Sequence, residues 1–504
     1  MVTGLSHVSI AVPDLEAAAR QLNDKYGLRV GARMVNAEQG VRLAYVELGA
    51  AKIELMEPSR PDSPVAKFLE RNPKGGIHHF CLGVDDVEKA AHAFAHNGVR
   101  VLGGGRPQRN VAGEPGRAGR ARRAEGVRRT MKIKRIEPIA VSFPMKKPVI
   151  MAGVEIRRAD NVLLRIEADN GIVGWGEAAS APTMTGETVE SMMAAIGYLT
   201  PALEGRPAED IAGALAAMAA RMYANNGAKA AIEIALHDLV GRATNQPAYA
   251  LLGGKQRSRM AVLGVISTGE LNSDLREAEG KKADGYVAFK IKVGIDTPLV
   301  DGERTRRLCQ LLGRDALISS DANQGWSTQE AVQYVRAVAD AGLGFFEQPV
   351  QADDIAGMAT VAAAAGKIAI GADEGIHSLD DIRRHHERSA ARGASLKAIK
   401  LGGMRGAAEA GRLCDALGLN VNVSAKTGES SIACAAAMHI AAALPQIAWG
   451  LTLTNEGLAD DVTARPVRIA RGHVEVSDRP GLGIDVDEER VRRYRRDVPV
   501  LQVA

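Results

Sequence analysis

The pattern of apolar and polar residues divides this chain of 504 residues into three regions. Short apolar stretches alternate with helical patterns over residues 1–105 and again, over a much longer run, from Met131 to the end. Residues 106–130 contain almost no large apolar residue and cannot build a core. We therefore predict two folded parts joined by a flexible linker, in a chain too long for one ordinary core.

The sequence pattern of the first folded part predicts a repeated βαβββ unit. Residues 5–58 have the pattern of a strand, a helix and three strands, and a helix at 63–72 leads to a further strand at 78–84. A helix over 85–98 and a strand over 99–104 follow, after which the pattern stops. The second unit therefore lacks two strands, and we expect a partial module.

The sequence pattern of the second folded part predicts an α/β fold. We expect a (β/α) barrel with an α+β capping domain. Residues 131–255 begin strand-rich and continue into a long alanine-rich helical region, which we assign to the capping domain together with residues 466–504. Over residues 256–465, eight apolar strand candidates alternate with helical stretches, as in a parallel barrel. These candidates are RMAVLGVIS, YVAFKIK, ALISSDA, GLGFFEQ, KIAIGADE, SLKAIKL, NVNVSA and IAWGLTL.

Composition and charge exclude several classes of protein. The linker 106–130 holds eight arginines and two acids, which gives +6, so the rest of the chain sums to 4 − 6 = −2 and predicts no nucleic-acid partner. A basic arm for an acidic partner stays open for the linker itself. No apolar run of eighteen residues and no signal-peptide pattern occur, so we expect a cytoplasmic protein without a membrane partner. We expect reduced thiols at the four scattered cysteines, Cys81, Cys309, Cys414 and Cys434.

Charged residues stand at the ends of successive barrel strands. Counted from Lys292, the intervals to the next four are 29, 26, 26 and 24 residues, so each lies about one βα unit beyond the last. This regularity places them around one rim, where barrel active sites are built. The residues are Lys290 and Lys292, then Asp321, Glu347, Asp373 and Lys397.

These residues are suited to removing a proton beside a carboxylate. One acid at a strand end is usually a helix cap, but three on consecutive strands favour a site for Mg²⁺ or Mn²⁺, and a divalent ion stabilises the enediolate that proton loss creates. Lys290 and Lys292 point the same way, so their mutual repulsion would favour a neutral amine that can act as a base. Lys397 would lie across the ring, and a bound substrate would sit between it and Lys292.

Several motifs resemble the muconate-lactonizing-enzyme (mandelate racemase/muconate cycloisomerase) subgroup of the enolase superfamily. They are AFKIKVG, SSDANQGW, FFEQP, GADEG, LKAIKLGG and AAIEIALHDLVG. Enzymes of this superfamily use a lysine or histidine base with Mg²⁺, and the resemblance implies that Lys292 is the base and Lys397 the partner acid/base. The other implied site residues are the metal ligands Asp321, Glu347 and Asp373 and the supporting residues Asn323, Gln348 and Glu374.

The sequence differs from the subgroup at positions that would contact the substrate. At the eighth strand end, residues Leu451–Thr454 carry neither the glutamate of cycloisomerases nor the D-x-D of dipeptide epimerases. Racemase, epimerase, cycloisomerase and dehydratase of a hydroxy or sugar acid therefore stay open. The neutral loops Met151–Gly153 and Pro182–Gly186 suggest an uncharged distal group. Lys426 would either contact a carboxylate or face outward.

The first folded part resembles the vicinal-oxygen-chelate fold, in particular methylmalonyl-CoA epimerase. The similar segments are LSHVSIAV, EQGVRLAYVELGAAKIELMEP and GIHHF. The resemblance implies a divalent metal held by His7, Glu54 and His79, with a fourth ligand on a strand that the second unit lacks. We expect little epimerase activity unless another chain supplies that strand.

The leading interpretation is a fusion protein whose barrel is a metal-dependent isomerase or lyase of a small-molecule carboxylate, and we expect a homo-oligomer. Acyl-CoA epimerisation by the first part is the second interpretation. A non-catalytic metal-binding or scaffolding protein is the third, and the paired lysines argue against it because metal binding alone needs no base.

Overall fold

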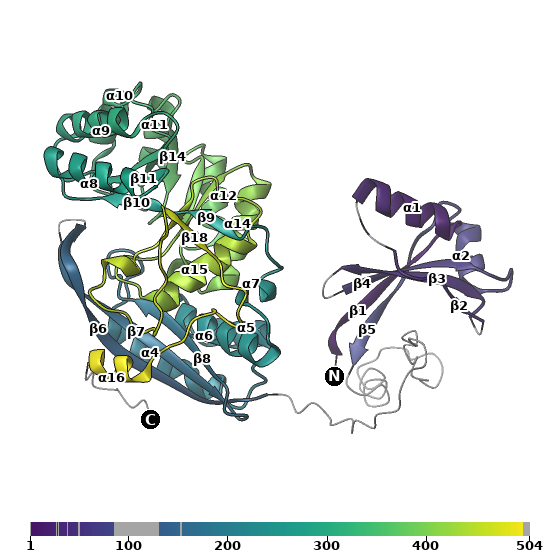
Figure 1. The fold of residues 1–504 in the computed structure, drawn as a ribbon. Coiled ribbons are helices and arrows are strands. Elements are labelled where there is room, and N and C mark those ends of the chain that lie inside the picture. Colours follow the sequence, from purple (N-terminus) through teal and green to yellow (C-terminus); the bar gives the residue numbers. More distant parts are fainter. Residues whose placement is uncertain are drawn as a thin grey trace. The chain divides into compact units, whose positions relative to one another are not determined.

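The structure is a computed structural model that describes residues 2–84, 131–151 and 154–496, with positions 27, 29, 38, 49 and 50 excepted. The chain divides into two compact units, Met1–Ala124 and Glu125–Ala504, each described here by itself (Figure 1). The predicted linker and the helix and strand predicted at 85–104 lie outside the described residues. The domain boundaries given above stay predictions. No helix in the described part is long and apolar enough to cross a membrane.

The first unit is a five-stranded sheet in the order β2-β3-β4-β1-β5. Its first strand pairs parallel with β4 and antiparallel with β5, so the predicted βαβββ order of residues 5–58 is confirmed. The strand predicted from residue 29 is shorter than expected, since only three residues of β2 extend alongside β3. The elements are β1 (Val2–Ala11), α1 (Leu15–Tyr26), β2 (Met34–Asn36), β3 (Val41–Leu48), β4 (Ala51–Pro58), α2 (Pro64–Arg71) and β5 (Gly76–Val84).

The second unit opens with an antiparallel sheet and a group of helices. Gly174 and Gly176 of the last strand let α6 approach closely, because a Cβ at either position would overlap the helix backbone. The C-terminal helix α16 returns to this sheet, where the Arg496 amide donates to the Ala140 carbonyl at 2.9 Å (Figure 1). The elements are β6 (Ile133–Met151), β7 (Val154–Ala168), β8 (Val173–Ala179), α4 (Val189–Leu199), α5 (Ile211–Arg221), α6 (Asn226–Thr244), α7 (Ala248–Leu251) and α16 (Glu488–Tyr494).

Eight parallel strands follow one another around a barrel in the order β10 to β17. A parallel bridge between Val262 and Leu451 brings the first and last strands together. The predicted fold class is therefore confirmed. The barrel strands are β10 (Leu263–Ile266), β11 (Ala288–Lys292), β12 (Leu317–Asp321), β13 (Phe345–Glu347), β14 (Ala369–Ala372), β15 (Gly393–Leu396), β16 (Asn420–Ser424) and β17 (Leu451–Thr452).

Helices alternate with the barrel strands, and their beginnings follow the sequence. Ser327 caps the helix after β12, since its hydroxyl accepts from the Glu330 amide at 3.3 Å while the Glu330 carboxylate accepts from the Ser327 amide at 2.9 Å. The helices are α8 (Leu271–Ala283), α9 (Pro298–Leu312), α10 (Thr328–Ala337), α11 (Ile355–Ala364), α12 (Leu379–Glu387), α13 (Ala398–Leu401), α14 (Met404–Ala416) and α15 (Ser431–Ala443).

Two predicted strands differ from the structure. The apolar run 259–267 is broken, because β9 (Arg259–Ala261) pairs antiparallel with β18 (His473–Glu475) before β10 enters the barrel. The strand predicted over 395–401 ends at Leu396, and α13 then begins directly after Lys397. An apolar run alone does not show where a chain leaves a sheet.

Aromatic side chains fill the end of the barrel where the strands begin. The Phe345 and Trp449 rings stack with their centroids 4.1 Å apart and their planes 5° from parallel. Leu263 and Ala288, the first residues of their strands, complete this buried cluster. Apolar packing therefore closes one end of the barrel and leaves the charged strand ends at the other.

Replacing Trp449 by Ala should destabilise the protein by about 3–5 kcal/mol, because it leaves a cavity beneath the rim. Urea unfolding would measure this loss. The exposed Tyr223, with 95% of its surface accessible, is the control, and Tyr223→Ala should change stability by about 0.5 kcal/mol or less. Equal stability of the two variants would contradict the packing described here.

Candidate active site

The ends of successive strands hold the predicted residues on one rim of the barrel. The parallel register sets Lys292 opposite Asp321, and Asp321 opposite Glu347. Asp373 follows the last residue of β14, and Lys397 follows the last residue of β15. These five residues line one cavity of about 390 Å³. The structure thus brings together side chains that lie up to about a hundred positions apart in the chain.

Two lysines of β11 form short ion pairs with carboxylates on the next two strands, β12 and β13. The Lys290 ammonium lies 2.6 Å from Glu347 Oε2. The Lys292 ammonium lies 2.6 Å from Asp321 Oδ2 and donates to Asn323 Oδ1 at 2.6 Å. Lys290 is almost fully buried, with 4% of its side chain exposed, whereas Lys292 keeps 19% exposed. Lys292 is therefore the more accessible of the two from the cavity.

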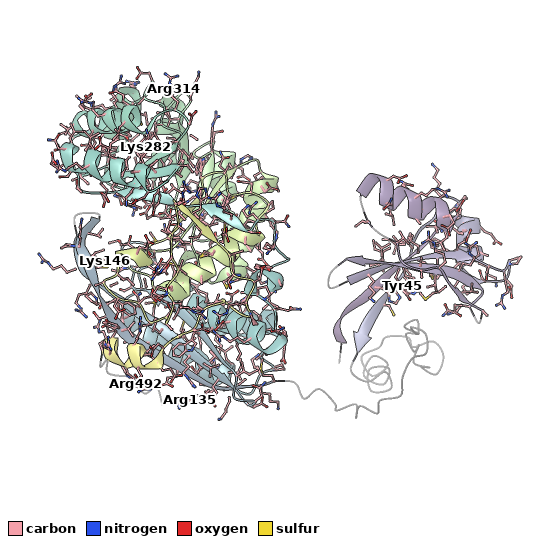
Figure 2. The ribbon with its side chains drawn as sticks, in the orientation of Figure 1. Tyr45, Arg135, Lys146, Lys282, Arg314 and Arg492 are labelled. Atoms are coloured by element: carbon pink, nitrogen blue, oxygen red, sulfur yellow. The ribbon has the colours of Figure 1, made fainter. Side chains whose placement is uncertain are left out.

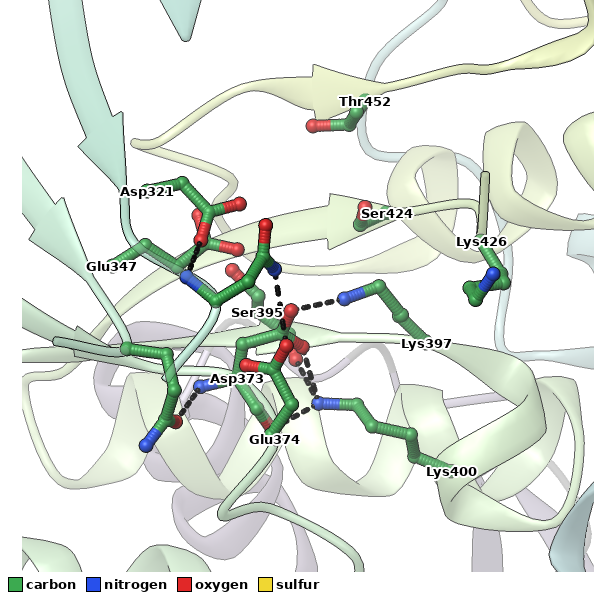
Figure 3. Close-up of polar contacts among 12 residues, drawn as sticks. Asp321, Glu347, Asp373, Glu374, Ser395, Lys397, Lys400, Ser424, Lys426 and Thr452 are labelled. Carbon is green, nitrogen blue, oxygen red and sulfur yellow. Dashed lines mark hydrogen bonds and ion pairs between the residues drawn. The ribbon is translucent and has the colours of Figure 1, made fainter. Parts of the chain in front are cut away.

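Two further lysines converge on Asp373 from the other side of the rim (Figure 3). Lys397 pairs with Asp373 Oδ2, and the Lys400 ammonium lies 2.6 Å from Oδ1 of the same carboxylate. Lys400 also donates to the Ser395 carbonyl at 2.9 Å and is fully buried. Sequence reasoning missed Lys400. Its signal was the spacing in LKAIKLGG, where it follows Lys397 by one helical turn.

The three supporting residues hold the loops that follow the strands. Asn323 donates to Glu374 Oε1 at 3.0 Å. The Gln348 side-chain oxygen accepts from the amides of Asp373 and Gly375, at 2.8 and 3.2 Å. Asn323 and Gln348 have positive φ angles of 42° and 35°, an uncommon conformation that these hydrogen bonds help to maintain. Gln348 therefore orients Asp373 and does not itself face the cavity.

Burial and charge act against each other on the rim. Burial raises the pKa of Asp321, but Lys292 and Lys290 outweigh it and hold that pKa below its usual value. Burial lowers the pKa of Lys290, but the charges of Glu347 and Asp321 raise it by more, so the pKa lies above its usual value. The predicted weakening of one lysine by the other is therefore wrong for Lys290. Burial raises the pKa of Glu374 to about 7, and no lysine pairs with it directly among the described contacts.

Two buried carboxylate oxygens of the rim, Glu347 Oε1 and Glu374 Oε2, have no donor among the described residues. Glu347 Oε1 lacks a hydrogen bond although its side chain is 1% exposed. Buried polar atoms in proteins are nearly always satisfied, by protein, water or an ion. Three carboxylates on neighbouring strands offer hard oxygen ligands of the kind that Mg²⁺ and Mn²⁺ accept. The residues present therefore fit a divalent cation.

Lys426 belongs to the cavity, so the outward-facing alternative is wrong. It follows β16 by two residues, lines the cavity and is 6% exposed. Burial lowers the pKa of Lys426 to about 8; Lys397 and Lys292 also lower it, while Glu429 opposes them. Thr452, at the eighth strand end, lines the same cavity with a hydroxyl.

The cavity mouth differs from the neutral surface that the loops predicted. Met184 of the loop Pro182–Gly186 lines it, together with Lys146 and Lys147 of β6, which are both exposed; Figure 2 shows Lys146. Residues 152 and 153 of the other loop lie outside the described residues. Because Glu277 and Glu456 line the same cavity, its wall is charged with both signs and not neutral as the two loops suggested.

The first unit contains a second cluster of candidate metal ligands. His7, Glu54 and His79 each offer one ligand atom, and these atoms lie within 4.8 Å of one another. They share one face of the sheet, because Ser9 of β1 pairs with both Glu54 and His79 and lies two residues beyond His7. The Ser9 hydroxyl lies 2.5 Å from Glu54 Oε2, and Tyr45 donates to Oε1 at 2.7 Å (Figure 2).

Comparison with known proteins gives the family. Residues 135–253 match the mandelate racemase/muconate lactonizing enzyme N-terminal domain, and residues 274–490 match the enolase C-terminal domain-like family. A chloromuconate cycloisomerase of Delftia acidovorans is 32% identical over 371 residues, which cover 73% of this chain and 100% of that protein. The chain belongs to the mandelate racemase/muconate lactonizing enzyme family. Residues 6–115 match the glyoxalase/bleomycin resistance protein/dioxygenase superfamily.

Other relatives in the mandelate racemase/muconate lactonizing enzyme family differ in their reactions. An N-succinyl-L-Arg/Lys racemase of Bacillus cereus is 30% identical, over 72% of this chain and 97% of the length of the racemase. Among solved structures, a muconate lactonizing enzyme of Pseudomonas fluorescens complexed with muconolactone has a TM-score of 0.70 and 29% identity, and it covers 73% of this chain and 100% of its own. Members of the family thus catalyse different reactions, and membership alone does not identify the reaction of this chain.

Removing the ammonium of Lys400 should leave Asp373 and the Ser395 carbonyl each short of a buried donor. Lys400→Met should lower the free energy of unfolding by about 1–3 kcal/mol. Urea unfolding beside Lys367→Met, which removes an exposed lysine, would measure the difference. Equal stability of these two variants would show that the buried contacts of Lys400 contribute nothing.

Proposed function

We propose that the barrel unit is a divalent-metal-dependent isomerase that removes the proton next to the carboxylate of a small-molecule substrate. The observation that carries this proposal is the placement of two lysines around the ring. Lys292 ends β11 and Lys397 follows β15, four strands later in a barrel of eight, so the two approach the cavity from opposite sides. The carboxylates lie on the strands between them.

The candidate metal ligands are Asp321, Glu347 and Asp373. Their oxygens are held by ion pairs and by the loop hydrogen bonds described above, and Glu347 Oε1 still lacks a donor among the described residues. A bound Mg²⁺ or Mn²⁺ would offset the negative charge that proton removal adds to the substrate carboxylate.

The lysines would divide the proton transfers between them. Lys292, the more accessible of the KxK pair, would take the proton from one face of the substrate. Lys397, 7% exposed, would return a proton from the other face or stabilise charge there. Lys290 also lines the cavity, but it is bound to Glu347 and almost fully buried, so it would fix that carboxylate.

Racemisation, epimerisation or cycloisomerisation is the reaction type that these contacts support best. The relatives named above include a cycloisomerase and a racemase, and a further relative is an L-Ala-D/L-Glu epimerase of Bacillus subtilis, 32% identical over 357 residues. Thr452 supplies a hydroxyl where an acid would hold a substrate ammonium, which opposes a dipeptide substrate. Dehydration of a hydroxy or sugar acid is the alternative reaction. A homo-oligomer stays an expectation.

Replacing the two lysines should separate their roles. For a racemase or epimerase, Lys397→Ala should abolish turnover while Lys292 still exchanges the proton of one enantiomer with solvent. Loss of an acid/base group typically costs about 10²–10⁴ in rate. Proton exchange in deuterated water with Mg²⁺, measured by NMR over a library of chiral carboxylates, would test this.

The matched control for both variants is Lys367→Ala, at an exposed position, which should exchange and turn over like the unmodified protein. Unchanged turnover by Lys397→Ala would favour one-base elimination or cycloisomerisation. Full exchange and turnover by Lys292→Ala would overturn the assigned base and the proposed mechanism with it.

We also propose that the first unit binds a divalent metal through His7, Glu54 and His79. The support is the three ligand atoms within 4.8 Å of one another on one face of the sheet. Ser9 and Tyr45 hold the Glu54 carboxylate in place. Because a fourth protein ligand is absent from the described residues near this cluster, we expect metal binding without efficient acyl-CoA epimerisation.

Calorimetric titration of the full chain with Co²⁺ would test this second site. The unmodified protein should take up two ions, one in each unit, and a His7→Ala/His79→Ala variant should take up one. His386→Ala, which removes an exposed histidine, should leave both sites intact. Two ions bound by the double variant would contradict the assignment of these histidines.

A further inference from the structure

A second cavity, of about 420 Å³, lies between α14 and the helices α5, α6 and α7. It shares no lining residue with the cavity at the barrel rim. Buried apolar side chains form part of its wall, among them Val240 and Leu252, and charged side chains complete the lining. A hollow with an apolar wall and a few polar groups is the usual form of a site for a small molecule.

His237 is the most deeply buried titratable residue of this cavity, with 2% of its side chain exposed. Its Nδ1 lies 3.0 Å from the Glu233 carbonyl oxygen and 3.2 Å from Glu233 Oε1. Because a carbonyl oxygen only accepts, Nδ1 carries a hydrogen. The other ring nitrogen, Nε2, has no hydrogen-bond partner among the described residues. Buried polar atoms rarely lack a partner, so Nε2 indicates a ligand in the cavity.

The charge of Glu233 favours the protonated form of this imidazole. Glu233 is fully buried, and its carboxylate also accepts the amides of Met404 and Arg405, at 2.7 and 2.9 Å. Burial and Arg405 lower the pKa of His237, but Glu233 raises it by more. In the protonated form Nε2 is a second N–H donor, which suits an anion.

Two arginines of α14 line the same cavity. Arg412 donates to the Leu252 carbonyl and has no carboxylate partner in the described part of the chain. Arg405 donates to Glu409 from Nε at 3.0 Å, and its two terminal nitrogens make no hydrogen bond there. Guanidinium groups with free donors are the common protein partners of carboxylates and phosphates.

The three acids that line the cavity already accept hydrogen bonds from the chain. Glu209 accepts the Met131 amide at 3.2 Å. Asp210 caps α5, since its Oδ1 accepts the Gly213 amide at 2.9 Å. Glu409 is held by the arginine just described. The donors without a partner in the cavity therefore belong to its cationic residues.

We propose that this cavity binds a small organic oxyanion, with its acidic group on His237, Arg405 and Arg412 and its apolar part on Val240 and Leu252. The site goes beyond the proposed function and does not depend on it. Carboxylates and phosphates share this recognition, because both offer oxygens that a guanidinium group binds in pairs. Losing one charged hydrogen bond corresponds to roughly 10- to 100-fold weaker binding.

Calorimetry of the full chain with benzoate, phenylphosphonate and the neutral benzamide tests the site. In metal-free buffer, at least one of the two anions should bind at least about 10-fold tighter than benzamide, and the tighter anion identifies a carboxylate or a phosphate site. Arg412→Met should weaken that anion by roughly 10-fold or more and leave benzamide unchanged, whereas Arg412→Lys should keep part of the preference. Arg383→Met, at an exposed position of α12, should behave like the unmodified protein.

Two further variants locate the bound anion. Lys397→Ala, at the barrel rim, should bind the anion like the unmodified protein, because the two cavities share no residue. His237→Phe should lose the preference for the anion, and the exposed Arg412 keeps the test valid if this buried substitution prevents folding, as thermal melting would show. The proposal is overturned if the three probes bind equally or none binds, if Arg412→Met keeps full affinity, or if Lys397→Ala loses the anion.

Discussion

Neutralisation of buried charge is the constraint on which the rim depends. Carboxylates and ammonium groups at the ends of apolar strands cannot lose water unless opposite charges or ligands meet them. Parallel pairing provides such meetings, because its register sets Lys292 beside Asp321 and brings Lys290 within 2.6 Å of Glu347, two strands away. Asp373, which meets both Lys397 and Lys400, completes the arrangement.

The same constraint explains the surroundings of the rim. The aromatic stack of Phe345 and Trp449 fills the other end of the barrel, opposite the charged strand ends that line the cavity. Gln348 and Asn323 hold the loops in positive-φ conformations that keep the carboxylates directed inward. Lys426 is the exception, since its side chain lines the cavity and has no carboxylate partner among the described residues.

Periodicity was sufficient to predict the barrel and the rim residues. Residues that end apolar strands about one βα unit apart must lie on adjacent strands of a parallel barrel. This holds whatever the lengths of the helices. Lys400 was missed because its position in α13 follows from where β15 ends, and the apolar run SLKAIKL does not mark that end. The direction of the pKa shift at Lys290 also required the structure, because it depends on distances to Glu347 and Asp321.

In the first unit, too, the sequence predicted which residues lie together but not the side-chain contacts between them. The resemblance to the vicinal-oxygen-chelate fold implied that His7, Glu54 and His79 would lie together, and the pairing of β1 with β4 and β5 places them on one face of the sheet. The contacts of Ser9 and Tyr45 with Glu54 could not be predicted, because they depend on side-chain positions across three strands.

A crystal structure of the protein grown with Mg²⁺ tests most directly whether the three rim carboxylates form one metal site facing two opposed lysines. We predict a single ion bound by an oxygen of each of Asp321, Glu347 and Asp373 at about 2.1 Å, with Lys292 and Lys397 on either side of the space in front of it. An ion bound elsewhere, or the three carboxylates still paired only with lysines at saturating Mg²⁺, would contradict it.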